Sequence, residues 1–449
     1  MSRAEEIRYT GDAEEYLLQI PMFTKEKHSL SEIQRIFERI GRIPKGRIIH
    51  VAGTNGKGSV CAFLASVLKK AGYRTGVFTS PHLCNMRERI AIDGEIISRR
   101  DFEHAFRLVL GDVRDCMKDG MSHPAFFEFL FYMAMVYFCE KQADYIILET
   151  GLGGRLDATN ICHPVVSVIT SVSMDHMEYL GDTLEAIARE KAGIIKKGIP
   201  VVFSAASPVV RAVIEKRAEE LSAPCLSVFP KDYETDLCEE GLQVRTSWKE
   251  KEGEQKELSF TISIPAPYQG ENAVLALRAL AVLDAGISAD MLISGMEQAR
   301  WPGRMEQLLP GIYLDGAHNV DGILKFTQAV NALLDRSVKT PGKGPRKARL
   351  LFAVAKDKEY EKMAEILCKN TAWLEIFTTR IDNGRGFDED RIRRTLESCA
   401  DCPVKAFPSS EEAFLEGLRC KKEDELLFCA GSLYFVGEIK EILEKYGYH

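Results

Sequence analysis

Short apolar runs alternate with longer stretches of helical spacing over the N-terminal part of the chain. The runs with strand character lie at 48–52, 75–78, 144–149, 165–170 and 201–203. The stretches with helical spacing or composition lie at 13–20, 29–40, 60–71, 99–117, 129–139 and 183–195. Strands that alternate with helices in this way predict a parallel sheet with helices packed on it.

The C-terminal part predicts a second domain of the same class. Two alternating runs, 242–248 and 258–264, flank a charged tip and predict a β-hairpin, and a helix is expected at 274–286. Residues 301–305 (WPGRM) interrupt the pattern like a linker. Strands predicted beyond it lie at 311–315, 350–354, 374–378 and 425–429. They alternate with helices predicted at 321–334, 360–367, 391–399 and 410–418. The Gly/Pro/Lys segment 339–347 between them predicts a flexible loop.

We therefore expect an α/β protein of two domains. Residues 1–300 would form an N-terminal domain with a parallel sheet of the P-loop ATPase type. Residues 301–449 would form a smaller, Rossmann-like α/β domain. A chain of 449 residues is long enough for more than one core.

The most informative stretch is 48–60, IIHVAGTNGKGSV, which places a glycine-rich turn between a predicted strand and helix. Backbone N–H groups and the positive end of a helix dipole would face an anion there, and Lys57 adds a charge. The turn is not a strict Walker A motif, because Val51 and Gly58 replace its first glycine and its Mg²⁺-binding hydroxyl. Another residue would have to supply that oxygen. A plain surface turn is the alternative.

Three side chains that follow predicted strands are candidates to bind Mg²⁺, because ligands gather at the carboxyl edge of a parallel sheet. Ser80 could supply the missing hydroxyl, and Glu149 ends an apolar strand as in a Walker B motif. His176 follows the strand at 165–170, although imidazole is not a preferred Mg²⁺ ligand. A turn serine and a structural histidine are the alternatives.

Lys191 lies in a predicted helix beside the small residues Ala188, Ala192 and Gly193. Close packing there would lower the pKa of its amine, and a neutral amine can take up carbon dioxide as a carbamate. A solvated helix lysine is the alternative. The nearby run 151–160 is not an NAD fingerprint, because Leu156 stands where that motif needs a small residue.

Composition excludes some classes of function. The net charge is −7 and no long basic run occurs, so nucleic-acid binding is not expected. The most apolar stretch, 129–139, is 11 residues, whereas a membrane span needs roughly 20. The 12 cysteines show no framework and the N-terminus shows no signal peptide, so we expect a cytoplasmic protein. Cys399 and Cys402 form a C-x-x-C without a second pair, interpreted as incidental.

Ten motifs, in this order, resemble those of folylpolyglutamate synthases and dihydrofolate synthases, which belong to the Mur ligase family. They are VAGTNGKGSV, FTSPHL, FFEFL, LETGLGGRLDATN, DHMEYLGDT, EKAGIIK, QGENA, WPGRME, LDGAHN and AGSLYFVGE. The resemblance covers almost the whole chain. It implies that ATP phosphorylates a carboxylate of a folyl substrate and that the amine of L-glutamate attacks the acyl phosphate.

The resemblance also implies roles for particular residues. Those expected to bind ATP are Gly53, Thr54, Asn55, Gly56, Lys57, Gly58, Ser59, Asn272, Arg304 and Asp315. Those expected to bind two Mg²⁺ ions are Ser80, Glu149, His176 and a carbamylated Lys191. Those expected on the substrate side are Phe127, Glu128, Leu156, Asp157 and Ala158. Lys57, Lys191 and His318 are the candidate catalytic residues, the role of His318 being open.

Some choices stay open. Ala125 and Phe131 stand where many relatives have threonine, so the choice between dihydropteroate and reduced folates is undecided. The small-molecule partners expected are a folate or dihydropteroate and L-glutamate, on a monomeric protein. One competing hypothesis is a Mur-type ligase acting on a cell-wall nucleotide precursor, which the GKGS and TSPHL segments disfavour. The other is a P-loop nucleotide switch without ligase activity.

Overall fold

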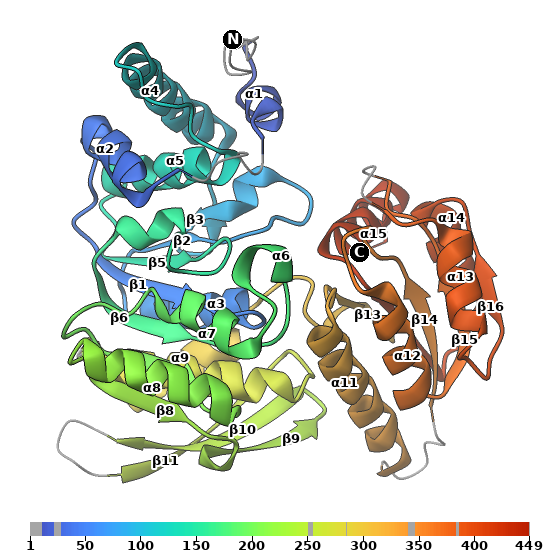
Figure 1. Ribbon diagram of the computed structural model, residues 1–449. Coiled ribbons are helices and arrows are strands. Elements are labelled where there is room, and N and C mark those ends of the chain that lie inside the picture. Colours follow the sequence, from blue (N-terminus) through green and yellow to red (C-terminus); the bar gives the residue numbers. More distant parts are fainter. Residues whose placement is uncertain are drawn as a thin grey trace. The chain divides into compact units, whose positions relative to one another are not determined.

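The structure is a computed structural model, and it describes residues 11–21, 28–249, 255–283, 285–339, 346–382 and 386–448 (Figure 1). The chain divides into two compact units. The first comprises Met1–Asp232 and Glu271–Met296, and the second comprises Tyr233–Gly270 and Glu297–His449. The boundary expected at residue 300 differs from this division in two respects: Tyr233–Gly270 and residues 297–300 also group with the C-terminal residues.

The first unit is built on an eight-stranded sheet with the order β4-β3-β2-β5-β1-β6-β7-β8. Its strands are β1 (Arg47–Ala52), β2 (Thr75–Phe78), β3 (Ile90–Ile92), β4 (Glu95–Ile96), β5 (Tyr145–Glu149), β6 (Pro164–Ile169), β7 (Val201–Ser204) and β8 (Cys225–Val228). Six strands are parallel to one another: β2, β5, β1, β6, β7 and β8. The strands β3 and β4 extend the sheet beyond β2 with antiparallel pairing. The carboxyl ends of six strands therefore share one edge.

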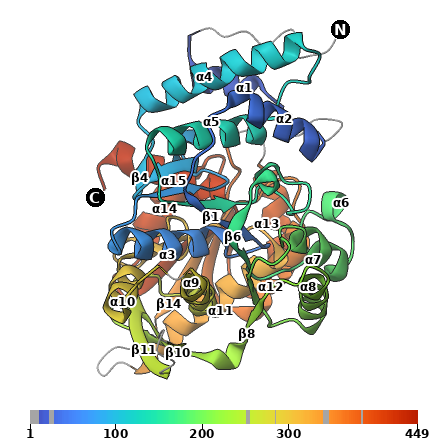
Figure 2. The same cartoon turned by 90° about the vertical axis from the view of Figure 1, so that its left-hand side faces the viewer.

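Helices cover this sheet (Figure 2). They are α1 (Ala13–Gln19), α2 (Leu30–Ile40), α3 (Lys57–Lys70), α4 (Arg99–Lys118), α5 (Phe126–Glu140), α6 (Met177–Leu180), α7 (Leu184–Ala192), α8 (Pro208–Glu220), α9 (Tyr268–Val282) and α10 (Ala289–Gln298). The expected apolar helix is α5, which is buried along most of its length because its residues are apolar on every face. The predicted helix at 29–40 is α2, capped by a reciprocal Ser29–Glu32 capping box.

The second unit contains two sheets. A three-stranded antiparallel sheet has the order β11-β10-β9, with β9 (Tyr233–Cys238), β10 (Gly241–Lys249) and β11 (Gln255–Ile262). A six-stranded sheet has the order β12-β13-β17-β14-β15-β16. Its strands are β12 (Glu306–Leu309), β13 (Ile312–Asp315), β14 (Lys347–Phe352), β15 (Trp373–Thr378), β16 (Val404–Ala406) and β17 (Glu425–Ala430). All but β12 are parallel, as the alternation of strands and helices predicts.

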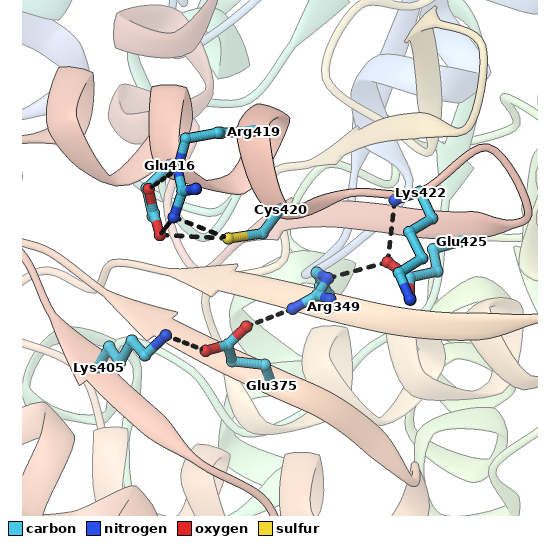
Figure 3. A network of polar contacts seen from close by, with 8 residues as sticks. All are labelled: Arg349, Glu375, Lys405, Glu416, Arg419, Cys420, Lys422 and Glu425. Carbon is cyan, nitrogen blue, oxygen red and sulfur yellow. Dashed lines mark hydrogen bonds and ion pairs between the residues drawn. The ribbon is translucent and has the colours of Figure 1, made fainter.

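The helices of this unit are α11 (Val320–Lys339), α12 (Tyr360–Asn370), α13 (Glu389–Glu397), α14 (Ser410–Cys420) and α15 (Leu433–Tyr446). A chain of charged side chains crosses the six-stranded sheet (Figure 3). Arg349 on β14 is buried and pairs with Glu375 on β15 and, at 3.1 Å, with Glu425 on β17. Lys405 on β16 pairs with Glu375 at 2.6 Å. Every charge in this chain faces an opposite charge.

The predicted fold class is confirmed, and the differences are local. The expected hairpin has a third strand, β9, and the helix expected from residue 274 begins at Tyr268. The elements that were not predicted include the strands β3, β4, β8, β12 and β16 and the helices α6, α8, α10 and α15. Most of the expected loop at 339–347 lies outside the described residues. Within the described part of the chain, no helix has the length and apolar character needed to cross a membrane.

Candidate functional site

The glycine-rich turn leads from β1 directly into α3, which begins at Lys57. Gly56 is the N-cap residue of α3, with a left-handed φ of 90°, and no side chain caps the helix there. The positive end of the helix dipole and its first N–H groups are therefore available to an anion. Of the expected cradle, Gly53, Thr54, Asn55 and Gly56 form the turn, and Lys57, Gly58 and Ser59 are the first residues of α3.

The turn is held in place by the segment that follows β6. The Thr54 amide donates to the Ser171 carbonyl at 2.8 Å, and the Thr54 hydroxyl donates to the Ser173 carbonyl at 3.1 Å. The Asn55 carbonyl accepts from the Thr170 hydroxyl at 2.7 Å. The backbone of the turn is thus fixed by groups more than 100 residues away along the chain.

Close packing explains two of the glycines. A Cβ atom on Gly53 would lie 1.8 Å from Thr170 Oγ1, and one on Gly56 would lie 2.3 Å from Asn272 Oδ1. Asn272 is buried within the first turns of α9. Its side chain lies against the glycine-rich turn.

Lys57, Glu149 and Ser80 come together at the carboxyl edge of the sheet. Lys57 Nζ lies 3.1 Å from the Thr54 carbonyl and 3.8 Å from Glu149 Oε1. Glu149 is buried, and its Oε2 accepts from the Ser80 amide at 3.2 Å. A carboxylate and a hydroxyl are oxygen donors of the kind that Mg²⁺ prefers, so this pair fits a magnesium site.

Lys191 is buried in α7, and its amine donates to the Gly53 carbonyl at 2.7 Å. Burial and, to a smaller extent, the charge of Lys57 lower the pKa of this amine to about 7, while Asp175 and Asp157 oppose the shift. The solvated-lysine alternative is therefore wrong. Near neutral pH a large fraction of this amine is neutral and able to react.

His176 is more exposed than the other predicted ligands. It adopts a left-handed φ of 51° at the start of the short helix α6, and 40% of its side chain is exposed. Its Nε2 atom lies 3.9 Å from Asp175 Oδ1. In the part of the chain that the structure describes, no three or more His, Cys, Asp or Glu side chains form a group able to hold a metal. The set Ser80, Glu149, His176 and Lys191 stays a prediction.

Asp157 organises the loop after β5. Its buried carboxylate accepts from the Gly151 amide at 2.8 Å and from the Leu152 and Thr159 amides at 3.0 Å. Burial raises the pKa of Asp157, and these hydrogen bonds oppose the rise. The neighbours differ: Ala158 is buried, whereas Leu156 is 40% exposed. Of the three residues in this loop that were expected on the substrate side, Leu156 is the one exposed to solvent.

The other two expected substrate residues begin α5. The ring of Phe127 lies 5.3 Å from that of Phe78, and it also packs on Gly151, where a Cβ atom would meet Phe127 at 2.8 Å. Glu128 accepts from the Ala125 amide at 2.8 Å and pairs with His28 at 2.7 Å. This hydrogen bond raises the pKa of His28. Glu128 therefore caps α5 and also forms an ion pair when His28 is protonated.

In the second unit, Asp315 ends β13 as Glu149 ends β5. Its buried carboxylate accepts from the Tyr268 hydroxyl at 2.8 Å, the Met305 amide at 2.9 Å and the Ala317 amide at 2.8 Å. Burial raises the pKa of Asp315, and the nearby Arg304 opposes the rise. Tyr268 was not predicted as part of this group, because its position just ahead of the expected helix gave no signal.

Arg304 and His318 lie beside the same turn. A Cβ atom on Gly316 would lie 2.3 Å from Arg304 Nη1, so the guanidinium packs directly against the backbone at Gly316. His318 Nδ1 lies 2.7 Å from the Gly316 carbonyl, which sets the ring with its Nδ1–H toward that oxygen. The predicted Arg304, Asp315 and His318 thus form one cluster in the second unit.

A parallel-sheet unit with a phosphate-type turn, joined to a second α/β unit, is the architecture of Mur-type ligases. Residues 117–280 match the model of the Mur ligase middle domain. The chain is 34% identical over 431 residues to a dihydrofolate synthase/folylpolyglutamate synthase of Bacillus subtilis, covering 93% of this chain and 95% of that protein. The chain therefore belongs to the folylpolyglutamate synthase/dihydrofolate synthase family.

Solved structures agree in fold. E. coli FolC in complex with DHPP and ADP has a TM-score of 0.82 and 25% identity, over 98% of this chain and 99% of that one. A folylpolyglutamate synthase of Thermotoga maritima has a TM-score of 0.80 and 28% identity, over 96% of each chain. The predicted family and the predicted α/β architecture are both confirmed.

Proposed function

We propose that this protein is an ATP-dependent ligase that joins L-glutamate to a folate and extends it to folylpoly-γ-glutamates through an acyl phosphate. Two lysines, Lys57 and Lys191, at one glycine-rich turn carry this proposal. The family membership and the E. coli relative, whose structure contains ADP, support a nucleotide at this turn. Dihydropteroate as a second acceptor of glutamate is the open alternative, since the B. subtilis relative is named for both activities.

The residues of the turn would bind and orient the ATP phosphates. The uncapped start of α3 would face the phosphate oxygens, and Lys57 would neutralise the charge that builds up during transfer to the folate carboxylate. Asn272 would hold the turn from the side of α9, and Arg304 and Asp315 are proposed as further nucleotide-binding residues. The acceptor carboxylate needs little help from a base, because it is already ionised at neutral pH.

Ser80, Glu149 and His176 would hold one Mg²⁺, and Lys191 as its carbamate would hold a second. Bound Mg²⁺ supplies charge neutralisation at the transferring phosphoryl group. For the carbamate, the neutral Lys191 nitrogen attacks the carbon of carbon dioxide and loses a proton. The low pKa of Lys191 supports this step, because it leaves a lone pair on the nitrogen near neutral pH.

The folate would bind near the start of α5 and beside the loop that follows β5. Phe127 and Leu156 would offer apolar contact to a pterin ring, and the capping pair Glu128–His28 would hold the start of α5 beside it. Asp157 and Ala158 would act by shaping the loop. His318 would lie with Arg304 and Asp315, on the side of the second unit. The protein is expected to work as a monomer.

The deciding experiment is phosphate release from ATP in the presence of L-glutamate. A reduced folate monoglutamate, dihydropteroate and no pterin would be compared, and the amide product would be identified by mass. Release with the folate alone indicates a polyglutamate synthase, and release with both indicates a bifunctional enzyme. Phosphate release that depends on neither the pterins nor glutamate would contradict the proposal and favour a nucleotide switch. Release only with a UDP-sugar precursor would favour a cell-wall ligase.

A further inference from the structure

The C-x-x-C pair of Cys399 and Cys402 has a third cysteine beside it in the fold. Cys399 follows the end of α13, and Cys368 lies in the last turn of α12. The Cys399 Sγ atom lies 2.9 Å from the Cys368 Sγ atom. Both residues belong to the second unit and both are partly exposed.

The packing of α12 against α13 fixes this approach. Cys399 Sγ also lies 3.7 Å from the Ala364 carbonyl, one turn before Cys368, and 3.5 Å from the Leu396 carbonyl. Cys368 Sγ lies 4.0 Å from that same Leu396 carbonyl. Each thiol therefore sits against the helix that carries the other. A disulfide has an S–S length of about 2.05 Å, so the two sulfurs need to close by only about 0.9 Å.

We propose that Cys368 and Cys399 are a modification site: a thiol pair that a low-molecular-weight disulfide converts reversibly into a cross-link between α12 and the end of α13. The cross-link would join residues 31 positions apart. This inference is independent of the ligase activity, because no residue of the predicted ATP or folate sites takes part.

The chemistry is two successive thiol–disulfide exchanges with, for example, oxidised glutathione. The Cys399 thiolate attacks one sulfur of the reagent, which breaks its S–S bond and releases one glutathione thiolate. The Cys368 thiolate then attacks Cys399 Sγ in the mixed disulfide and releases the second. The protein pair loses two electrons and two protons, and the reagent leaves as two glutathione thiols. A dithiol such as dithiothreitol reverses both steps.

The surroundings of this pair slow its exchange with a disulfide. Burial and the hydrogen bond with Cys399 raise the pKa of the Cys368 thiol, and the nearby Cys402 raises it further. Burial also raises the pKa of Cys402. Because the thiolate is the reactive form, exchange is slow at neutral pH and needs an excess of the disulfide. Within the described residues, the cysteines here do not form a group able to hold a metal.

The test is to incubate the reduced full-length protein with excess oxidised glutathione, alkylate the remaining thiols in denaturant, and map the peptides by mass. We expect a Cys368–Cys399 cross-link that is absent in Cys368→Ser, where glutathione stays on Cys399. The matched control is Cys225→Ser, which removes an exposed cysteine of the first unit and should leave the cross-link intact. Free thiols, glutathione adducts alone, or a Cys399–Cys402 bond in the unsubstituted protein would overturn the proposal.

A second readout is thermal unfolding followed by tryptophan fluorescence. All 3 tryptophans, Trp248, Trp301 and Trp373, belong to the second unit, so their emission follows that unit. A cross-link that closes this segment removes freedom from the unfolded chain, and the oxidised protein should unfold several degrees higher than the reduced protein. Cys368→Ser should show no such difference. An unchanged midpoint in a protein whose cross-link is confirmed by mass would mean that the bond strains the helices.

Discussion

Both units bury charged side chains, and the two clusters differ in how their charges are matched. Around Arg349 in the second unit, cations and carboxylates alternate across neighbouring strands (Figure 3). At the glycine-rich turn of the first unit, two lysines approach the same loop, and the carboxylate next to Lys57 is Glu149. The charge of Lys57 lowers the pKa of Lys191, which an alternating arrangement would not do.

This contrast separates a structural cluster from a binding site. The Arg349 cluster lies toward the beginning of its strands, and its charged side chains form ion pairs with one another. The lysine cluster lies at the carboxyl edge, beside a helix start that no side chain caps, and it brings two amines to one loop. Amines brought together in this way are stabilised when an anion arrives, so burial of charge alone does not mark a site, whereas like groups held close to one another do.

The largest effect is expected from Lys57→Ala, because it removes the charge nearest the phosphate turn. Turnover in the glutamate ligation assay should fall by roughly 10²–10³-fold or more, as it does when one transition-state donor is lost. The control is Lys70→Ala, an exposed lysine at the other end of α3, which should keep full activity. Substantial activity in Lys57→Ala, with an unchanged circular dichroism spectrum, would remove the phosphate-cradle role.

Lys191→Ala should be nearly as damaging, and a small carboxylate such as acetate should restore part of the activity. Rescue is expected because acetate supplies the carboxylate that a carbamate would place there. Lys197→Ala, a nearby exposed lysine, serves as the control and should behave like the unsubstituted protein. Loss of activity without any rescue by acetate would argue for the amine itself rather than its carbamate.

The same lysine sets a dependence of stability on pH. Its pKa is about 7 in the folded protein and near the ordinary 10.5 when unfolded, so between these values the unfolded chain binds more protons. Lys191 should therefore make the free energy of unfolding rise with pH from about 7 to about 10.5. Denaturant titrations in buffer free of carbon dioxide should show this rise, and Lys191→Met should flatten it. Parallel curves for the two proteins would place the titration elsewhere.

Glu149→Gln is expected to weaken the binding of Mg²⁺. The amide keeps the shape and the Ser80 contact but loses the charge, so the Mg²⁺ concentration for half-maximal activity should rise by roughly 10-fold or more. Glu185→Gln, an exposed residue of α7, controls for net charge. An unchanged Mg²⁺ titration would move the metal to other residues.

The smallest effect on activity is expected from Arg349→Met, which breaks the matched cluster. It leaves Glu425 buried opposite an apolar side chain, and the second unit should lose about 3 kcal/mol of stability while turnover at low temperature is kept. Tryptophan fluorescence in denaturant would measure this. Glu416→Gln, in an exposed pair on α14, should show no measurable change. Equal loss of turnover and stability would tie this cluster to the active site.

Prediction from the sequence worked best where the hydrophobic pattern was strong. The apolar strands β1, β5, β6 and β7 were placed closely, because strands buried in a parallel sheet are nearly continuous apolar runs. The strand β9, Tyr233–Cys238, was missed because it is partly exposed along its length and rich in polar residues. The strand β16, only three residues long, carries too little pattern to be recognised.

For the candidate site, the sequence predicted that certain side chains share one edge of the sheet, but it did not predict what each side chain touches. Lys57, Ser80 and Glu149 meet because strand ends share an edge, which chain order alone suggests. The contact of Lys191 with Gly53 joins residues 138 positions apart, and nothing local encodes it. Cys368 was missed as a neighbour of Cys399 for the same reason. Tertiary packing, rather than propensity, decides such pairs.

An isolated β-bridge between Asn55 and Ser171 ties the glycine-rich turn to the segment that follows β6. Such a turn has little conformational freedom left to lose when a ligand is captured. Calorimetry of nucleotide binding should then show an entropy dominated by released water and counterions, with only a small penalty for ordering the backbone. The rate of nucleotide binding would then be limited by diffusion and desolvation rather than by folding of the loop, because the loop is already formed.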